Sequence, residues 1–205
     1  IERLRAMFRR PKPWGGSWSP PPDDELRIFA KMGRKSAKRF TIPEPSLTLH
    51  DTEVVRLARR EWIAVHTPGH TSDHLCLYDP EERLFISGDH VLPTITPHIA
   101  GAGPGGGLLY DDPLAEFFNS LRRMHDFDVR LVLPAHGHPF TDLAGRADHI
   151  IEHHHERLDV LRESVADLPS GTVADYMRRM FRERSWGDMA ESETFAHLEH
   201  LRLLG

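Results

Sequence analysis

The sequence predicts an α/β fold followed by a small helical module, and three observations lead to this prediction. Short apolar runs typical of buried strands recur up to Leu133, and several of them end in a polar loop. An amphipathic helix lies between two of these runs, which is the alternation expected of a layered sheet and helices. Beyond residue 144 the apolar residues recur only at helical spacing, so helices without strands are expected there.

The composition limits the classes of protein to which the chain can belong. Of its 205 residues, 39% are hydrophobic and 28% are charged, as in soluble globular proteins. The formal net charge of −5 argues against a general attraction to nucleic acid. No stretch is long and apolar enough for a transmembrane helix, and no signal peptide is recognisable. The single cysteine, Cys76, cannot form an internal disulfide, so a cytoplasmic location is expected.

The first part of the chain predicts one helix and one hairpin. Asp23 or Asp24 can cap a helix that runs to about Phe40. The lysines and arginines of this helix could contact an anionic substrate such as RNA, or they could form a solvated face. Two strands at residues 53–57 and 61–65, joined by a short turn, are expected to pair as a hairpin.

Three buried strands in the central region each lead into a loop that holds a histidine or an aspartate. These strands and the residues that follow them are 62–65 with His70, 84–86 with Asp89, and 129–133 with His136. Imidazole and carboxylate groups that converge from several strand ends are the ligands that zinc requires. The sequence therefore predicts a metal site formed by His70, Asp89 and His136. The alternative is that the three are ordinary turn residues, since histidine or aspartate beside glycine suits a loop.

Other histidines lie near these positions in the sequence. His90 and His138 are expected to be neighbours of the ligands, because adjacent side chains of an extended segment point apart. His74 could support the site or line its pocket. His98 belongs to a long loop after Asp89, and a loop of this length is expected to border the mouth of an active site.

Four helices are predicted in the rest of the chain. The first begins at Pro113, the second spans about 142–168, and Thr172 and Ser192 can cap the last two. The last helix is expected to carry the apolar residues Phe195, Leu198, Leu201 and Leu204. The consecutive histidines at 153–155 cannot chelate one ion together, because successive helix positions point about 100° apart. A structural role is predicted for them.

Three short motifs give the chain a resemblance to a known family. They are Thr67-Pro68-Gly69-His70-Thr71, Ser87-Gly88-Asp89-His90 and Pro134-Ala135-His136-Gly137. In their order and spacing these motifs resemble the later half of the metal site of the metallo-β-lactamase-fold hydrolases. The resemblance implies that His70 and His136 bind different metals and that Asp89, the expected catalytic carboxylate, bridges both.

The same resemblance implies a domain organisation. Residues 1–144 are expected to be the C-terminal part of the αββα catalytic domain, and residues 145–205 a winged-helix-like module similar to the tail of the β-lactamase-like endoribonuclease. The family's first motif, His-x-His-x-Asp-His, is absent and the chain begins with isoleucine, so we expect the later part of a longer protein. The last helix has no cluster of basic residues, so duplex DNA is not an expected partner, and packing or a homodimer is the better expectation.

The resemblance implies a metal-dependent hydrolase that uses a metal-activated hydroxide. Two Zn²⁺ ions are expected per complete site, with iron or manganese as alternatives. The expected substrate is a thioester, an ester or a phosphodiester, which means a small molecule, as for glyoxalase II, or RNA, and no membrane. Two alternatives remain open. The chain could be a catalytically silent fragment or interaction module without the upstream ligands, or it could hold one metal in a single His-Asp-His site.

Overall fold

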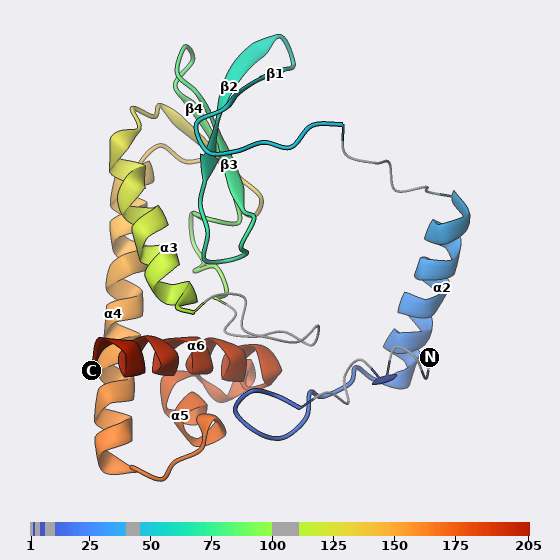
Figure 1. Cartoon of the computed structure of the whole chain (residues 1–205), viewed down its shortest axis with the longest axis vertical. Helices are drawn as coiled ribbons and strands as arrows, with labels where there is room; N and C mark the ends of the chain where they lie inside the picture. Colours follow the sequence, from blue (N-terminus) through green and yellow to red (C-terminus); the bar gives the residue numbers. More distant parts are fainter. Residues whose placement is uncertain (1, 3–4, 7–10, 40–45, 100–110) are drawn as a thin grey trace. The chain divides into compact units, whose positions relative to one another are not determined.

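A computed structural model describes residues 2, 5–6, 11–39, 46–99 and 111–205 of the chain. They belong to two compact units, one drawn from Ile1–Thr48 and the other from Leu49–Gly101 and Leu108–Gly205 (Figure 1). The first unit contains helix α2, Asp23–Arg39, with three acidic residues in its first turn. These carboxylates suit the positive end of the helix dipole, and the helix begins where the sequence predicted it. The predicted boundary at residue 144 stays a prediction.

The second unit contains one five-stranded sheet in which the strands follow one another in chain order. The strands are β1 Val54–Leu57, β2 Arg60–His66, β3 Leu75–Asp79, β4 Leu84–Gly88 and β5 Leu131–Pro134. The first four pair antiparallel with their neighbours, and β5 is parallel to β4. As a result β2, β4 and β5 run in the same direction and end at the same edge of the sheet. These are the three strands that the sequence predicted to lead into His70, Asp89 and His136.

Helices α3, Pro113–Arg122, and α4, Leu143–Asp167, form the hydrophobic core with the sheet. Helix α3 starts where Asp112 accepts a hydrogen bond from the backbone of Ala115, and the one-turn helix Arg123–Asp126 follows it. The buried side chains of the core come from each layer, and they include Val65, Cys76, Phe85 and Val132 of the sheet, Leu114, Phe117, Phe118 and Leu121 of α3, and Ala147, Ile150 and Leu158 of α4. The alternation of helix and strand that the sequence indicated is therefore present.

The C-terminal helices are α5, Val173–Met180, and α6, Asp188–Leu204, with the short helix Glu183–Ser185 between them. Helix α5 starts with a capping box formed by Thr172 and Asp175. Both helices pack against α4 and against each other (Figure 1). Among the described residues no strand follows α6, so the winged-helix form of this module stays a prediction.

One sequence prediction about α6 is wrong. The helix begins at Asp188 after Gly187, so Ser192 lies inside it and is not its cap. Of the apolar residues that it was expected to carry, Phe195, Leu198 and Leu201 are partly buried, and Leu204 is 64% exposed. The buried face consists of small and polar residues, namely Ala190, Ser192, Glu193, Thr194, Ala196, His197 and His200. Burial of a carboxylate and two imidazoles needs hydrogen-bond partners, and these are described below.

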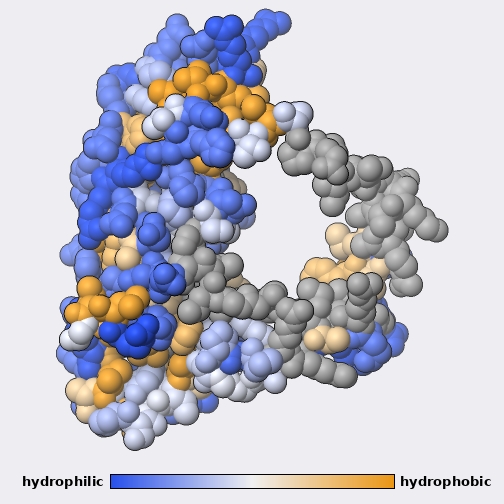
Figure 2. Space-filling view, viewed as in Figure 1, coloured by the Kyte–Doolittle hydropathy of each residue, from blue (hydrophilic) through white to orange (hydrophobic). Residues whose placement is uncertain are grey.

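The surface of the second unit is mainly polar. Hydrophilic residues cover most of the face seen in Figure 2, and the apolar residues on it form separate patches. None of the helices that the structure describes is long and apolar enough to cross a membrane.

Candidate metal centre at the edge of the sheet

The loop that holds His70 is fixed by α3. The hydroxyl of Ser120 donates to the carbonyl oxygen of Pro68 at 2.8 Å. Gly69 has a φ of +133°, and a Cβ atom at this position would lie 2.4 Å from Cβ of Phe117. Only glycine fits so close to the helix, so α3 and the Pro68-Gly69 turn together set the position from which the His70 side chain starts.

The loop that holds Asp89 is fixed by His74. The backbone N–H of Asp89 donates to Nε2 of His74 at 3.2 Å, and Nδ1 of His74 lies 2.7 Å from the hydroxyl of Thr67. Nε2 therefore accepts and Nδ1 carries the proton, which requires a neutral ring. Burial lowers the pKa of His74, and the nearby His70 lowers it further, so the neutral form is favoured. His74, which the sequence analysis placed near the site, thus connects the first loop to the second.

The absence of a side chain at Gly88 leaves room for the contact between His74 and the backbone of Asp89. Its φ is +53°, and a Cβ atom there would lie 2.7 Å from Nε2 of His74. The third motif repeats the pattern, because Gly137 has a φ of +85° and its Cβ position lies 2.7 Å from Pro93. Each predicted ligand is therefore adjacent in sequence to a glycine that has a positive φ and no room for a side chain.

The structure brings Asp89 and His136 together. Nε2 of His136 lies 3.3 Å from Oδ1 of Asp89. The cause is the parallel pairing of β4 with β5, which ends with Gly88 opposite Pro134, and the backbone N–H of Ala135 donates to the carbonyl oxygen of Gly88. Both side chains remain accessible, with 36% of the Asp89 side chain and 67% of the His136 side chain exposed.

His70 lies on the neighbouring loop and has its own partner. Its Nδ1 atom lies 2.7 Å from the carbonyl oxygen of His98. Because a carbonyl oxygen only accepts, Nδ1 carries the proton and Nε2 is left with a free lone pair. This is the tautomer that a metal-binding histidine adopts when a backbone carbonyl orients it. The ring centroid of His70 lies 6.4 Å from that of His74, which in turn contacts Asp89.

The three predicted ligands do not form one compact cluster. Among the residues that the structure describes, the one group of three histidine, cysteine or acidic side chains whose ligand atoms all lie within 4.8 Å of one another is His154, Glu193 and His197. This second cluster is buried between α4 and α6. The sequence analysis predicted a structural role for His154 but did not identify its two partners, because they lie on another helix far along the chain.

The other histidines near the sheet edge differ in burial. His138 is exposed, whereas His90 is fully buried against the edge of the Phe117 ring, with ring centroids 5.2 Å apart. Burial lowers the pKa of His90 to about 3, so its ring is neutral at physiological pH. Both follow a predicted ligand in the sequence, and neither has a described hydrogen bond to Asp89 or His136.

A sequence model of the metallo-beta-lactamase superfamily matches residues 3–136. The chain belongs to this superfamily. The match includes the first two motifs and the third as far as His136, where it ends. It confirms the resemblance on which the prediction of the metal site was based.

Named relatives of this superfamily are similar to parts of the chain. The lactamase-like protein aptB of Emericella nidulans is 32% identical over 120 residues, which are 57% of this chain and 35% of the relative. An atrochrysone carboxyl ACP thioesterase of Aspergillus fumigatus is 27% identical over 159 residues, 78% of this chain and 35% of the relative. The probable metallo-hydrolase YqjP of Bacillus subtilis is 24% identical over 148 residues, 68% of this chain and 44% of the relative. The chain thus spans less than half the length of each of these relatives.

Two crystal structures of this superfamily share the fold. A metallo-beta-lactamase family protein of Thermus thermophilus superimposes with a TM-score of 0.69 at 30% identity, covering 89% of this chain and 60% of that one. A beta-lactamase domain protein of Burkholderia ambifaria gives 0.69 at 28% identity, with 87% and 56% covered. Residues 1–144 alone could not give this coverage, so the similarity extends into the C-terminal helices.

Proposed function

We propose that the protein is a metal-dependent hydrolase of thioesters and that this chain contributes His70, Asp89 and His136 to its metal site. The contact between Asp89 and His136 supports the proposal most directly, because it joins two of the three motifs at one edge of the sheet. Superfamily membership supports the hydrolytic chemistry. The thioesterase among the relatives, similar over 78% of the chain, supports the substrate class.

The chemistry of the donor groups fits a transition metal such as zinc, iron or manganese. Imidazole nitrogens and a carboxylate are suitable ligands for these ions. The His70 tautomer leaves Nε2 free to bind, and a carboxylate such as Asp89 has two oxygens with which to bridge two ions. When bound, the metal would lower the pKa of a coordinated water and polarise the carbonyl under attack.

Residues of this chain fix the backbone around two of the predicted ligands, His70 and Asp89. Ser120 fixes the turn before His70, and His74 holds the backbone of Asp89. A dinuclear site needs more ligands than these three. They would come from another segment of the polypeptide or from a second copy of the chain.

The first test is the metal content of the purified protein, measured by elemental mass spectrometry. We expect about two metals per dinuclear site, and a marked loss in Asp89→Asn and His70→Ala. His138→Ala serves as the matched control, because His138 is an exposed histidine two positions from a predicted ligand and should change nothing. A single metal that is lost in the same variants would support a mononuclear site. Absence of metal after incubation with zinc would contradict the proposal and favour a catalytically silent chain.

The second test is activity on small acyl thioesters, followed by release of the free thiol. Thioester hydrolysis that disappears in Asp89→Asn and persists in His138→Ala would support the substrate class. Activity on RNA without activity on thioesters would assign the site to phosphodiesters instead. The net charge of −5 makes that second outcome the less expected one.

A further inference from the structure

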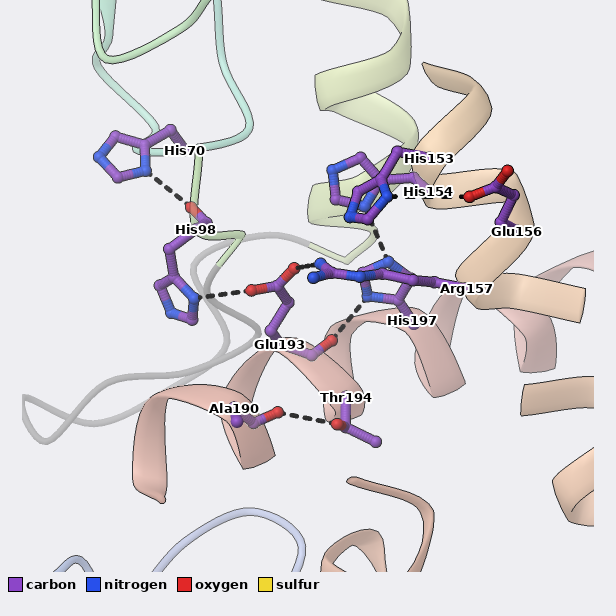
Figure 3. A network of polar contacts seen from close by, with 10 residues as sticks. All are labelled: His70, His98, His153, His154, Glu156, Arg157, Ala190, Glu193, Thr194 and His197. Carbon is purple, nitrogen blue, oxygen red and sulfur yellow. Dashed lines mark hydrogen bonds and ion pairs between the residues drawn. The ribbon is translucent and has the colours of Figure 1, made fainter. Parts of the chain in front are cut away.

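A chain of hydrogen bonds connects His70 to the C-terminal helices (Figure 3). His98 links the two ends of this series of hydrogen bonds. Its backbone carbonyl oxygen accepts a hydrogen bond from His70, and Nδ1 of its ring donates one to Oε2 of Glu193 at 3.1 Å. The other carboxylate oxygen of Glu193 accepts from Arg157. The side chain of His98 therefore attaches its loop to Glu193 in α6, and Glu193 in turn connects the loop to Arg157 in α4.

The carboxylate at the centre of this network is firmly held. Glu193 is 6% exposed, and its backbone carbonyl accepts a hydrogen bond from Nδ1 of His197. His197 in turn lies 2.9 Å from Nδ1 of His154. Burial alone would raise the pKa of Glu193, but the hydrogen bond from His98 and the charge of Arg157 lower it to about 2. The carboxylate is thus an ionised acceptor with little freedom to move.

The loop that contains His98 is also held along the rest of its described length. The guanidinium of Arg146 on α4 donates to the carbonyl oxygens of Leu92 and Ile95, at 2.7 and 2.9 Å. Ile99 is fully buried in the core. Arg146 thus holds the backbone before His98, Glu193 holds the His98 ring, and the burial of Ile99 holds the residue that follows, so the backbone carbonyl of His98 has a defined position.

The approach of His154, Glu193 and His197 could instead suggest a second cation site. The groups of Glu193 and His197 are already in use, however, since the two carboxylate oxygens of Glu193 have partners and His197 donates to a backbone carbonyl. Among the described residues, Nε2 of His154 alone in this cluster has no partner. The guanidinium of Arg157 also repels any cation that approaches the carboxylate. A fixed hydrogen-bonded anchor explains the cluster better than a metal site does.

We infer that Glu193 and Arg157 are positioning residues for His70, which they orient through the backbone carbonyl of His98. The role of this orientation in metal binding rests on the proposed function. The orientation itself is a property of the chain alone, because the His98 carbonyl keeps the proton of His70 on Nδ1 whether or not a metal is bound. The C-terminal helices are therefore part of the support of the candidate metal centre.

The inference can be tested on the metal-free protein with ¹⁵N-labelled histidine, using the ring nitrogen shifts of His70 to identify its tautomer. We expect the Nδ1–H tautomer in the parent protein. His98→Ala keeps the backbone carbonyl but removes the link to Glu193, so we expect a mixture with the Nε2–H tautomer. His98→Asn should restore the parent tautomer, because its side-chain amide nitrogen can donate to Glu193 in place of ring Nδ1.

His125→Ala is the matched control for this experiment. It also removes a contact between a histidine and a carboxylate, the 2.8 Å contact to Asp148, but has no link to His70. We expect it to leave the His70 tautomer unchanged. An Nε2–H tautomer in the parent protein, or an unchanged tautomer in His98→Ala, would overturn the inference.

Zinc affinity, measured by competition with a chromogenic chelator, separates this inference from the proposed function. Loss of a partner that orients a metal ligand weakens metal binding by about 10- to 100-fold. We expect a loss of this size in His98→Ala, recovery in His98→Asn and no change in His125→Ala. If the tautomer responds as expected but no variant binds zinc, the positioning role stands and the proposed function fails. If zinc binds equally well to the parent and His98→Ala, the orientation of His70 plays no part in metal binding, and the proposed function stands.

Discussion

His200 in α6 lies with its Nδ1 atom 2.8 Å from Oδ2 of Asp112, the residue whose other carboxylate oxygen caps α3. One carboxylate therefore serves two helices that are far apart in the sequence. Together with the link from Glu193 to His98, this contact gives α6 two polar attachments to the part of the fold that carries the candidate metal centre.

The first prediction concerns this double use of Asp112. Asp142→Ala removes only the cap of α4, the hydrogen bond to the backbone of Gly145, and should lower the free energy of unfolding by about 1 kcal/mol. Asp112→Ala removes a cap and the contact to His200, so it should cost about 1 kcal/mol more. Urea unfolding of the two variants measures the difference. Equal losses would mean that the contact between Asp112 and His200 adds no stability.

The second prediction concerns Gly88. Gly88→Ala places a methyl group within 2.7 Å of Nε2 of His74 in a left-handed backbone conformation, and it should weaken the hydrogen bond to Asp89. Gly16→Ala is the matched control, because Gly16 also has a positive φ of +77° but open space around its Cβ position. We expect Gly16→Ala to cost about 1 kcal/mol from backbone strain alone. Gly88→Ala should cost clearly more in urea unfolding and also weaken zinc binding, and a loss no larger than the control would count against the tight contact.

The third prediction concerns the ion pair between Arg157 and Glu193. Arg157→Met leaves the buried carboxylate without its cation, and we expect a loss of about 3 kcal/mol in the free energy of unfolding. The control on the same helix is Arg162→Met, which removes an exposed pair with Asp159 and should cost less than about 1 kcal/mol. Losses of the same size in both variants would show that the loss of the buried ion pair costs no more stability than the loss of the exposed one.

The fourth prediction concerns pH. Burial lowers the pKa of His197 to about 4 and that of His154 well below its ordinary value. The unfolded chain then binds more protons than the native protein, so this stabilisation is complete above about pH 6.5 and is lost as the pH falls towards about 4. For His197 alone the loss should reach about 3 kcal/mol. Urea unfolding between these two pH values should show the decline, and His197→Gln should make it smaller. An unchanged slope in the variant would contradict the assignment.

The sheet edge was predictable because a strand and the polar residue at its end can both be recognised within a short stretch of sequence. A short apolar run followed by glycine and a polar residue identifies a strand and its end within about ten residues. Three such runs were found, and their parallel directions bring Asp89 next to His136. The sequence did not reveal that His74 would lie between His70 and the backbone of Asp89, because the hydrogen bonds of His74 depend on how two loops pack together.

The C-terminal helices were predicted less well for a physical reason. For α6 the sequence analysis singled out the leucines and a phenylalanine, because hydrophobic periodicity registers only apolar residues. The structure buries His197, Glu193 and His200 instead, because each finds a partner on another element. Such partners are distant in the sequence, so a single chain read from its pattern alone gives no signal that would have paired Glu193 with His98.

The attachment of α6 to the loop of His98 also bears on how proteins of this architecture can diverge. A module joined only by a flexible linker can be exchanged by recombination without harm to its neighbour. Here an exchanged helix would take with it the acceptor for His98 and the partner of Asp112, and it would uncover Phe118, whose ring packs against His155 and His200. The sheet edge and the C-terminal helices are therefore expected to be inherited as one unit, in which a change on either side must be matched by a compensating change on the other.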